Sequence, residues 1–323
     1  MADTQMVVFT ARGRATFTEA QASRLEAAAR ATFVEAASPI SEDELVRLLR
    51  DAQVCGLTPR SVPVIGESWL SRLPHLSDIA VFATGVDYID TAWLRERGIR
   101  LSHLPDYSTV SVAEHAIGLM LTMSRRIHLS QDRVRGRVPA GTSVLGFELR
   151  GKTLGIVGTG RIGSRVAELG RAFGMRVLAY DPKEREQEGV AAVGLDELLA
   201  SSDIVSLHFP AAWRGEAAIG RSELARMKAG ATLINVSRCA LVEPLAVVEA
   251  IEAGRLRGYA VDDRFPLAET DARAARQIAE GRLLQTGHTA WYSAEVIERG
   301  YEMWVDNLCA MAAGEPRRLV DAR

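Results

Sequence analysis

The chain has 323 residues, of which 47% are hydrophobic and 25% charged, and its formal net charge is −2. This length exceeds what one hydrophobic core usually serves, so two domains are expected. The small net charge argues against a nucleic-acid-binding or membrane-surface protein, because such proteins carry an excess of basic residues. The three cysteines, Cys55, Cys239 and Cys309, are widely spaced and show no metal or redox pattern.

The N-terminal stretch MADTQMVVFT has no basic segment followed by a long apolar one, so it lacks the pattern of a signal peptide. No window approaches the roughly 18 consecutive apolar residues of a membrane-spanning helix. These features, with the unpatterned cysteines, predict a cytoplasmic protein that has neither a membrane nor a nucleic acid as a partner.

Short apolar runs alternate with helical patterns over the first 104 residues. Strands are expected at 5–9, 31–36, 52–57, 78–84 and 99–104, and helices at 19–30, 41–51 and 90–98. Ser41 followed by Glu44 is the pattern of a capping box and marks the start of the second helix. Strand–helix alternation predicts a parallel sheet covered by helices on both faces.

A long helical pattern over 109–136 precedes a second series of alternating strands and helices. Its strands are expected at 153–157, 176–181, 203–210, 231–238, 256–263 and 282–288, and a terminal helix at 293–314. The two series predict an α/β protein with two doubly wound parallel-sheet domains. The long helix is expected to cross from one domain to the other.

Gly158, Gly160 and Gly163 form the pattern G-x-G-x-x-G between the strand TLGIV and a helix. That context is typical of dinucleotide-binding sites. The first glycine permits a tight turn, the second lets the backbone approach a pyrophosphate, and the third lets helix and strand pack closely. The helix IGSRVAELGRAFG is expected to begin at Ile162, directly after Arg161, so free N–H groups and the positive end of the helix dipole would face the phosphates at these two residues.

The next apolar run ends at Asp181, 23 residues after Gly158. A carboxylate at this position can accept hydrogen bonds from the adenosine ribose hydroxyls, and it would repel a 2′-phosphate. NAD is therefore the expected cofactor rather than NADP. The alternative is a glycine-rich turn that binds no ligand.

Chemically versatile side chains follow the later strands of the second series, namely His208, Ser237 and Arg238, Asp262, and His288. In open α/β sheets ligands bind beyond the carboxyl ends of the strands, so these residues should gather beside the dinucleotide. If a nicotinamide passes hydride to a carbonyl carbon, a histidine can protonate the oxygen. An arginine can bind a neighbouring carboxylate through two donors.

Each of these residues also has a structural interpretation. His208 could only shape the loop near the cofactor, Arg238 could be a surface residue, Asp262 could cap a helix, and His288 could be a capping or buried histidine. His115, which lies inside the long helical pattern, is assigned a structural role.

Four segments carry a resemblance to a known family: DYSTVSVAEHAIGLMLTMSRRIH, LRGKTLGIVGTGRIG, INVSRCALVE and TGHTAWYSAEV. With these motifs the chain resembles the NAD-dependent D-2-hydroxyacid dehydrogenases, and most of all the D-lactate dehydrogenases among them. The resemblance implies a Rossmann cofactor domain, residues 104–289, inserted into a flavodoxin-like substrate domain formed by 1–103 and 290–323. It also implies a homodimer formed through the cofactor domain.

The resemblance also implies roles for individual residues. Backbone N–H groups near Thr84 and Gly85 would bind the substrate carboxylate, and Tyr107 would line the substrate pocket. Arg238 matches the family's substrate-orienting arginine, and His288 matches its acid–base histidine.

Asp262 matches an aspartate near the nicotinamide amide, but the sequence after it departs from the family pattern D-V-F-x-x-E-P. The fifth residue after Asp262 is Leu267, where the family has the glutamate that partners the histidine. Glu269 and Asp263 are the nearest substitutes, and we expect Glu269 to be the better one. Cys239 also stands where the family has a glycine.

The sequence therefore predicts an oxidoreductase that transfers a hydride between NAD(H) and a small 2-oxo or D-2-hydroxy acid, without a metal. Two alternatives stay open. The same scaffold could act on a phosphonate or a phosphorus oxyacid analogue. It could also be a non-catalytic NAD-sensing protein, similar to the transcriptional corepressors that resemble this family, and the altered glutamate motif is a reason to keep this alternative.

Overall fold

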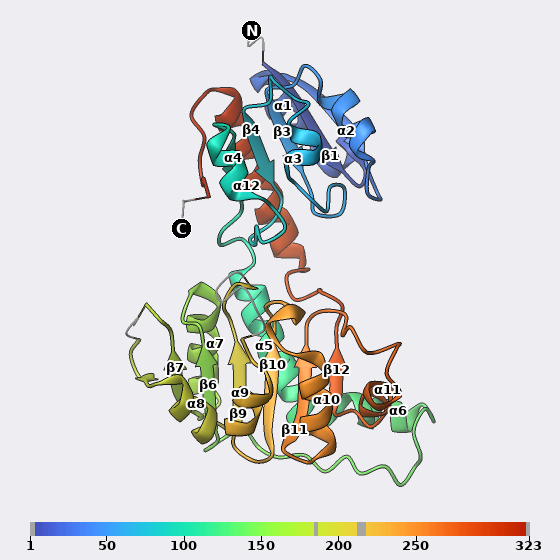
Figure 1. Ribbon diagram of the computed structural model, residues 1–323, viewed down its shortest axis with the longest axis vertical. Coiled ribbons are helices and arrows are strands. Elements are labelled where there is room, and N and C mark those ends of the chain that lie inside the picture. The colour runs from blue at the N-terminus through green and yellow to red at the C-terminus, as the bar shows by residue number, and fades with distance from the viewer. Residues whose placement is uncertain (1–3, 184–186, 212–217, 321–323) are drawn as a thin grey trace. The chain divides into compact units, whose positions relative to one another are not determined.

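The computed structural model describes residues 4–183, 187–211 and 218–320. The chain forms two compact units, one made of Met1–Ser108 with Ala294–Arg323 and the other of Thr109–Ser293 (Figure 1). Both boundaries lie a few residues later than the sequence analysis placed them. Among the helices of the described residues, none is long and apolar enough to cross a membrane.

The first unit contains a five-stranded parallel sheet. Its strands are β1 (Gln5–Thr10), β2 (Arg30–Glu35), β3 (Val54–Leu57), β4 (Asp78–Val81) and β5 (Arg100–Ser102). Their order, β2-β1-β3-β4-β5, is that of flavodoxin-like sheets. All five strands were predicted from their short apolar runs, with ends that differ by a few residues.

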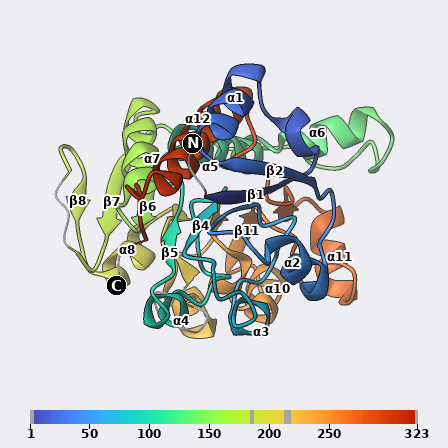
Figure 2. The same ribbon diagram turned by 90° about the horizontal axis from the view of Figure 1, so that it is seen from above.

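Helices of the first unit are α1 (Glu19–Ala28), α2 (Glu42–Leu49), α3 (Glu67–Leu70), α4 (Thr91–Glu96) and α12 (Ala294–Ala312), with a 3₁₀ turn η1 at Gly13–Thr16. The Ser41 hydroxyl accepts a hydrogen bond from the Glu44 N–H and so starts α2, which is half of the predicted capping box. The Glu44 carboxylate pairs with Arg47 instead of returning to the Ser41 N–H. The C-terminal helix α12 packs beside α1, which joins the two ends of the chain in one unit (Figure 2). Helix α3 was missed because four residues show no period.

The second unit contains a seven-stranded parallel sheet in the order β12-β11-β10-β9-β6-β7-β8. This is the Rossmann order, with one strand added beside the sixth. The strands are β6 (Thr153–Val157), β7 (Arg176–Tyr180), β8 (Ala191–Ala192), β9 (Ile204–Leu207), β10 (Ala231–Asn235), β11 (Leu256–Val261) and β12 (Leu283–Gln285). Only β8 was not predicted, since two alanines carry no strand signal.

The predicted long helix over 109–136 is two helices, α5 (Thr109–Arg125) and α6 (Ile127–Val134). They are separated by Arg126, whose φ of 55° is left-handed and cannot continue a right-handed helix. Both helices belong to the second unit, and α5 packs on α7 (Arg161–Ala172) and on the sheet.

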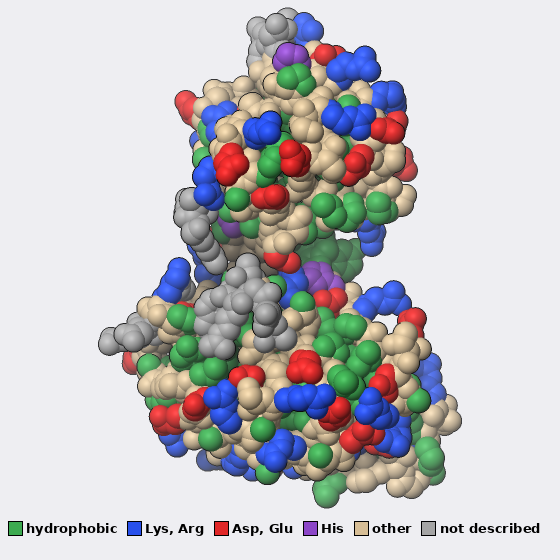
Figure 3. All heavy atoms as spheres, viewed as in Figure 1, with side chains coloured by type: hydrophobic (Ala, Val, Ile, Leu, Met, Phe, Trp, Pro, Cys, Tyr) green, Lys and Arg blue, Asp and Glu red, His purple; other side chains and the backbone are tan. Residues whose placement is uncertain are grey.

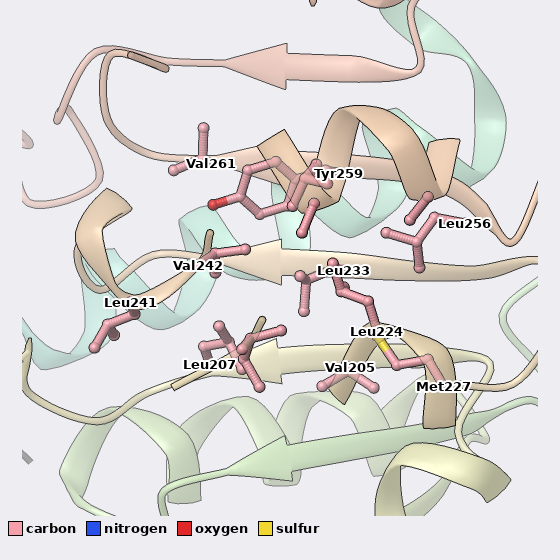
Figure 4. Packing of buried hydrophobic residues seen from close by; sticks show 14 of the residues in the cluster. Val205, Leu207, Leu224, Met227, Leu233, Leu241, Val242, Leu256, Tyr259 and Val261 are labelled. Atoms are coloured by element: carbon pink, nitrogen blue, oxygen red, sulfur yellow. The ribbon is translucent and has the colours of Figure 1, made fainter. Parts of the chain in front are cut away.

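Side chains of the second sheet alternate between two buried layers, as the period of a strand requires. Leu154 and Ile156 of β6 pack with α5 and α7, while Val157 faces the opposite helices. Those helices are α8 (Leu195–Ser201), α9 (Arg221–Arg226), α10 (Pro244–Glu252) and α11 (Ala272–Ala279). Figure 4 shows the second layer, in which the Tyr259 ring of β11 lies among aliphatic side chains.

Basic and acidic side chains are interspersed over the face that Figure 3 shows, on both units. Many charged side chains of the two units form ion pairs at the surface, such as Arg226 with Asp196 and Arg72 with Asp43. On the visible face no broad surface of one sign gathers over any element, which fits the net charge of −2.

Two helical glycines of the second unit differ sharply in their surroundings. A Cβ at Gly163 of α7 would overlap the Gly158 carbonyl oxygen and lie 3.2 Å from the His208 Cβ, so only glycine lets α7 approach the sheet this closely. A Cβ at Gly118 of α5 would meet nothing within 4 Å.

We therefore expect Gly163→Ala and Gly118→Ala to act in opposite directions. Gly163→Ala should destabilise the unit by about 1–3 kcal/mol, because a backbone atom has to move. Gly118→Ala should stabilise it by up to about 1 kcal/mol, because glycine is the more costly residue in a helix. Chemical denaturation of both variants measures the two changes, and equal shifts would contradict the close approach of α7.

Candidate functional site

The glycine turn follows β6 at the point where the strand order of the second sheet reverses, between β6 and β9. Gly158 has a φ of 95°, and a Cβ there would lie 2.7 Å from the His208 carbonyl oxygen. Gly160 is extended and occupies the N-cap position of α7, which then begins with Arg161 and Ile162. The first N–H groups of a helix have no acceptor within the helix, so they point to any ligand at this turn.

Asp181 follows β7 and turns back onto the glycine turn. Its Oδ2 accepts the Thr159 N–H at 2.7 Å and the Thr159 hydroxyl at 3.1 Å, and its Oδ1 accepts the Lys183 N–H at 2.9 Å. The acid predicted to bind ribose therefore lies beside the turn predicted to bind pyrophosphate.

His208 follows β9 and lies against the same turn, through its contacts with Gly158 and Gly163. Both ring nitrogens are buried and have no hydrogen-bond partner among the described residues. Burial lowers the pKa of this imidazole to about 3, so the ring is neutral near pH 7. Buried polar atoms are almost always satisfied, so two such nitrogens beside the glycine turn fit a polar ligand there.

The loop after β10 carries Ser237 and Arg238. Hydrogen bonds made by both of these residues fix it to β9 and to Asn235 of β10. The Ser237 hydroxyl donates to the Leu207 carbonyl at 3.1 Å, and its N–H donates to Asn235 Oδ1 at 3.0 Å. Asn235 is fully buried, and its Nδ2 bonds the Arg238 carbonyl at 2.9 Å and the Tyr259 hydroxyl at 3.1 Å. Sequence reasoning did not single out Asn235, which looks like one more strand residue.

Asp262 follows β11, is 4% exposed, and fixes the loop after β12. Its Oδ1 accepts the Thr286 hydroxyl at 2.7 Å and the Thr289 N–H at 2.8 Å, and its Oδ2 accepts the Ala290 N–H at 2.8 Å. These donors flank His288, which is exposed and has a φ of 64°. A left-handed φ costs a non-glycine residue about 1 kcal/mol or more, so the Asp262 contacts hold the histidine in a conformation it would not keep alone.

His115 of α5 adds a further contact to this loop. Its Nε2 lies 3.0 Å from the Thr286 Oγ and 3.7 Å from Asp262 Oδ1. The Thr286 hydroxyl already donates to Asp262, so Nε2 must carry the hydrogen and donate to Thr286. The structural role assigned to His115 is thus a specific one, although 171 residues separate it from Thr286 and no local signal reveals the pair.

The expected pair between Glu269 and His288 is not formed. The Glu269 side chain is 82% exposed and pairs with Arg264 at 3.1 Å. Asp263 accepts the Cys239 N–H at 3.3 Å and the Arg264 N–H at 2.9 Å. Within the described ranges, neither carboxylate contacts His288, and the ring has no side-chain partner.

The substrate loop predicted in the first unit follows β4. Thr84 donates its hydroxyl to the Leu104 carbonyl at 2.9 Å, and Leu104 donates its N–H to the Ala83 carbonyl at 2.9 Å. In the part of the chain that the structure describes, the N–H groups of Thr84 and Gly85 have no acceptor. Unpaired backbone donors in a partly buried loop suit an anionic ligand.

Tyr107, predicted to line the substrate pocket, is 4% exposed. Its ring lies edge-on to Phe82, with centroids 5.4 Å apart, and closely against Gly300. Its carbonyl accepts two hydrogen bonds from Arg299, at 2.9 and 2.7 Å. The contacts described for this residue are therefore those of the unit's own core.

No group of three or more histidines, cysteines or acids among the described residues is placed to hold a metal ion. What the second unit does provide is a glycine turn, an acid beside it, and polar loops at the ends of β9 to β12, all on one edge of a parallel sheet. This arrangement suits a dinucleotide and a small polar reactant.

Residues 117–290 match the family model described as "D-isomer specific 2-hydroxyacid dehydrogenase, NAD binding domain". The chain belongs to this family. It is therefore a member of a family of NAD-dependent oxidoreductases, and its second unit contains the NAD-binding domain.

Characterised relatives differ in the acid that their names give. The chain is 36% identical to a glyoxylate reductase of Aeropyrum pernix over 86% of its own length and 83% of the relative's. It is 32% identical to a glycerate dehydrogenase of Methylorubrum extorquens over 90% and 92%. A D-3-phosphoglycerate dehydrogenase of Archaeoglobus fulgidus is 37% identical, but the match covers 71% of this chain and only 44% of the relative.

Solved structures of similar fold include a D-lactate dehydrogenase from Aquifex aeolicus with NAD and lactic acid, with a TM-score of 0.78 and 30% identity over 96% of both chains. An acyclic imino acid reductase in complex with NADPH and D-Arg has a TM-score of 0.83 and 25% identity over 98% of this chain and all of the other. The fold thus serves different substrates and both forms of the nicotinamide cofactor.

We expect Asp262→Asn to loosen the loop that carries His288. An amide has one oxygen, and its NH₂ group would face an N–H donor, so at least one of the three contacts is lost at a cost of about 2–3 kcal/mol. The midpoint of chemical denaturation should fall, and the amide hydrogens of Thr289 and Ala290 should exchange faster.

Glu269→Gln is the control for this variant. It removes a surface pair with Arg264 and should change stability by less than about 1 kcal/mol. Unchanged exchange at Thr289 and Ala290 in Asp262→Asn would show that the carboxylate does not hold the loop.

Proposed function

We propose that this protein reduces a small 2-oxo acid with NADH, or oxidises the corresponding D-2-hydroxy acid with NAD. The observation that carries the proposal is the exposed His288, held by Asp262 at the same sheet edge as the glycine turn. A histidine in such a position can exchange a proton with a reacting oxygen.

In reduction, NADH held at the glycine turn would supply a hydride for C2 of the substrate. His288 donates a proton to the carbonyl oxygen, so that C=O becomes CH–OH. The guanidinium of Arg238 would orient the substrate. The N–H groups of Thr84 and Gly85 would bind a carboxylate. In oxidation, His288 accepts the hydroxyl proton instead.

The proposed roles at the cofactor follow from the same edge. Gly158, Gly160 and the N-terminus of α7 would bind the pyrophosphate, and Asp181 the adenosine ribose. His208 and Ser237 would line the cofactor site. Asp262 would contact the nicotinamide amide with lone pairs that its loop contacts leave available.

We also propose a cytoplasmic homodimer formed through the second unit. The end of α6 and the segment after it support this assignment, because each presents an apolar side chain that the described residues do not cover. Val134 is 82% exposed and Leu145 is 85% exposed. A second copy would remove both side chains from water.

A non-catalytic NAD-sensing protein is the second candidate. It is favoured by one observation, namely that His288 has no carboxylate partner among the described residues, while Glu269 pairs with Arg264. Such a protein would bind NADH but turn over 2-oxo acids feebly or not at all.

We expect the protein to bind NADH much more tightly than NADPH. The Asp181 carboxylate would lie close to the added 2′-phosphate, and two like charges repel each other strongly in a partly buried site. Asp181→Ala should narrow the difference between the two dissociation constants, which fluorescence titration measures. Equal affinity of the unchanged protein for both cofactors would contradict the expected repulsion between Asp181 and the 2′-phosphate.

A panel of small 2-oxo acids, including glyoxylate and pyruvate, tests the proposed activity through the loss of NADH absorbance. We expect turnover of at least one acid, and a loss of two or more orders of magnitude in kcat in His288→Ala, with NADH binding nearly unchanged. Glu269→Gln should retain kcat within about twofold, since its partner is Arg264. NADH binding without turnover of any acid would favour the second candidate.

A further inference from the structure

The donors proposed to bind the substrate carboxylate lie on a loop that is tied to the segment after β5. Three of the hydrogen bonds between the two segments matter here: Leu104 N–H to the Ala83 carbonyl, the Thr84 hydroxyl to the Leu104 carbonyl, and His103 Nδ1 to the Thr84 carbonyl at 2.9 Å. The first two bonds fix the position of the loop. The third acts on one peptide group of the loop.

The direction of the third bond follows from its chemistry. A carbonyl oxygen can only accept, so Nδ1 of His103 must carry a hydrogen and donate it to the Thr84 oxygen. The bond thereby fixes the direction in which the Thr84 carbonyl points.

That carbonyl belongs to the same peptide group as the Gly85 N–H. The peptide group is planar, and no cis peptide occurs among the described residues, so C=O and N–H point in opposite directions. Holding the Thr84 oxygen toward His103 therefore directs the Gly85 N–H away from it. Gly85 has no Cβ and a wide range of φ and ψ, so without this bond the peptide group could rotate more freely.

His103 is itself firmly held. Its N–H donates to the Arg318 carbonyl at 3.2 Å, and its carbonyl accepts from Asn307 Nδ2 at 3.1 Å. Asn307 is fully buried in α12, and its Oδ1 accepts from the Arg318 guanidinium at 2.7 Å. A ring anchored in this way can orient a loop, because its own backbone is fixed on both sides.

We propose that His103 is a positioning residue for substrate binding: its Nδ1–H sets the direction of the Gly85 N–H that binds the substrate carboxylate. This inference rests on the proposed function, since it assumes that the Gly85 N–H meets a carboxylate. His103 does not touch the substrate. Its contribution is to have the donor already directed before the anion arrives, so that binding does not have to order the loop.

His103→Leu and His103→Asn form a matched pair that tests the role. Asparagine carries an N–H donor, Nδ2, the same number of bonds from the backbone as His Nδ1, whereas leucine has a similar shape and no donor. Oxamate, an unreactive analogue of a 2-oxo acid, is titrated into the full-length protein saturated with NADH, and kcat and KM are measured for the best 2-oxo acid of the panel.

In His103→Leu we expect the oxamate dissociation constant and KM to rise about tenfold, which corresponds to one weakened hydrogen bond to a charged group. kcat should change by less than about twofold, and NADH should bind as before. His103→Asn should restore both constants to within about twofold of the unchanged protein. His75→Leu, at an exposed site of the same unit, should have no effect.

Equal behaviour of the leucine and asparagine variants, whether both are normal or both impaired, would overturn the role of the donor. If His103→Leu does not fold, His103→Ala replaces it with the same expectations. Oxamate binding does not require turnover, so the two proposals fail separately. Absence of turnover in the unchanged protein contradicts the proposed function, and an unchanged oxamate constant in the donor-free variant contradicts the role of His103.

Discussion

Two consecutive carboxylates at the end of β11 hold the two loops on which the candidate site depends. Asp262 accepts the Thr289 and Ala290 N–H groups around His288, and Asp263 accepts the Cys239 N–H next to Arg238. Both aspartates directly follow the strand, so one strand end reaches both loops. The relative positions of the histidine and the arginine are thus set by a single backbone segment, which lies between their own strands in the sheet.

Burial gives these contacts their strength. An almost fully buried carboxylate such as Asp262 is tolerated only when it is hydrogen-bonded, and here the bonds come from the loop rather than from a cation. The loop and the acid therefore stabilise each other, and the cost of the left-handed His288 is offset within the same network. In the first unit His103 acts on the Thr84 peptide by the same means, with a side chain fixing a backbone group.

The fold could be predicted largely from the sequence, because buried parallel strands are short apolar runs and their alternation with helices implies the sheet. The elements that were missed, α3 and β8, are too short to show a period, and the break at Arg126 is a backbone conformation without a sequence marker.

Within the site, strand-end positions identified Asp262 and His288 correctly as neighbours in space, since parallel strands end on one edge. The residues that hold these loops in place, Asn235 and His115, could not be found from strand-end positions. Asn235 looks like any residue of a buried strand, although it bonds the Arg238 carbonyl and the Tyr259 hydroxyl. His115 acts through Thr286, which lies 171 residues away in the sequence.

The position of Glu269 bears most directly on how the proposed histidine works. A carboxylate bonded to an imidazole would fix both its orientation and its tautomer. Here Glu269 lies in solvent with Arg264, and the orientation of His288 is set through the backbone instead, by the contacts of Asp262 on both sides of it. Such an arrangement fixes the backbone from which the His288 side chain extends. It does not fix which ring nitrogen carries the hydrogen, and that choice is left to a bound ligand. Under the proposed function, the reactant would complete the hydrogen bonding of the histidine, and its tautomer would be set once the acid is bound.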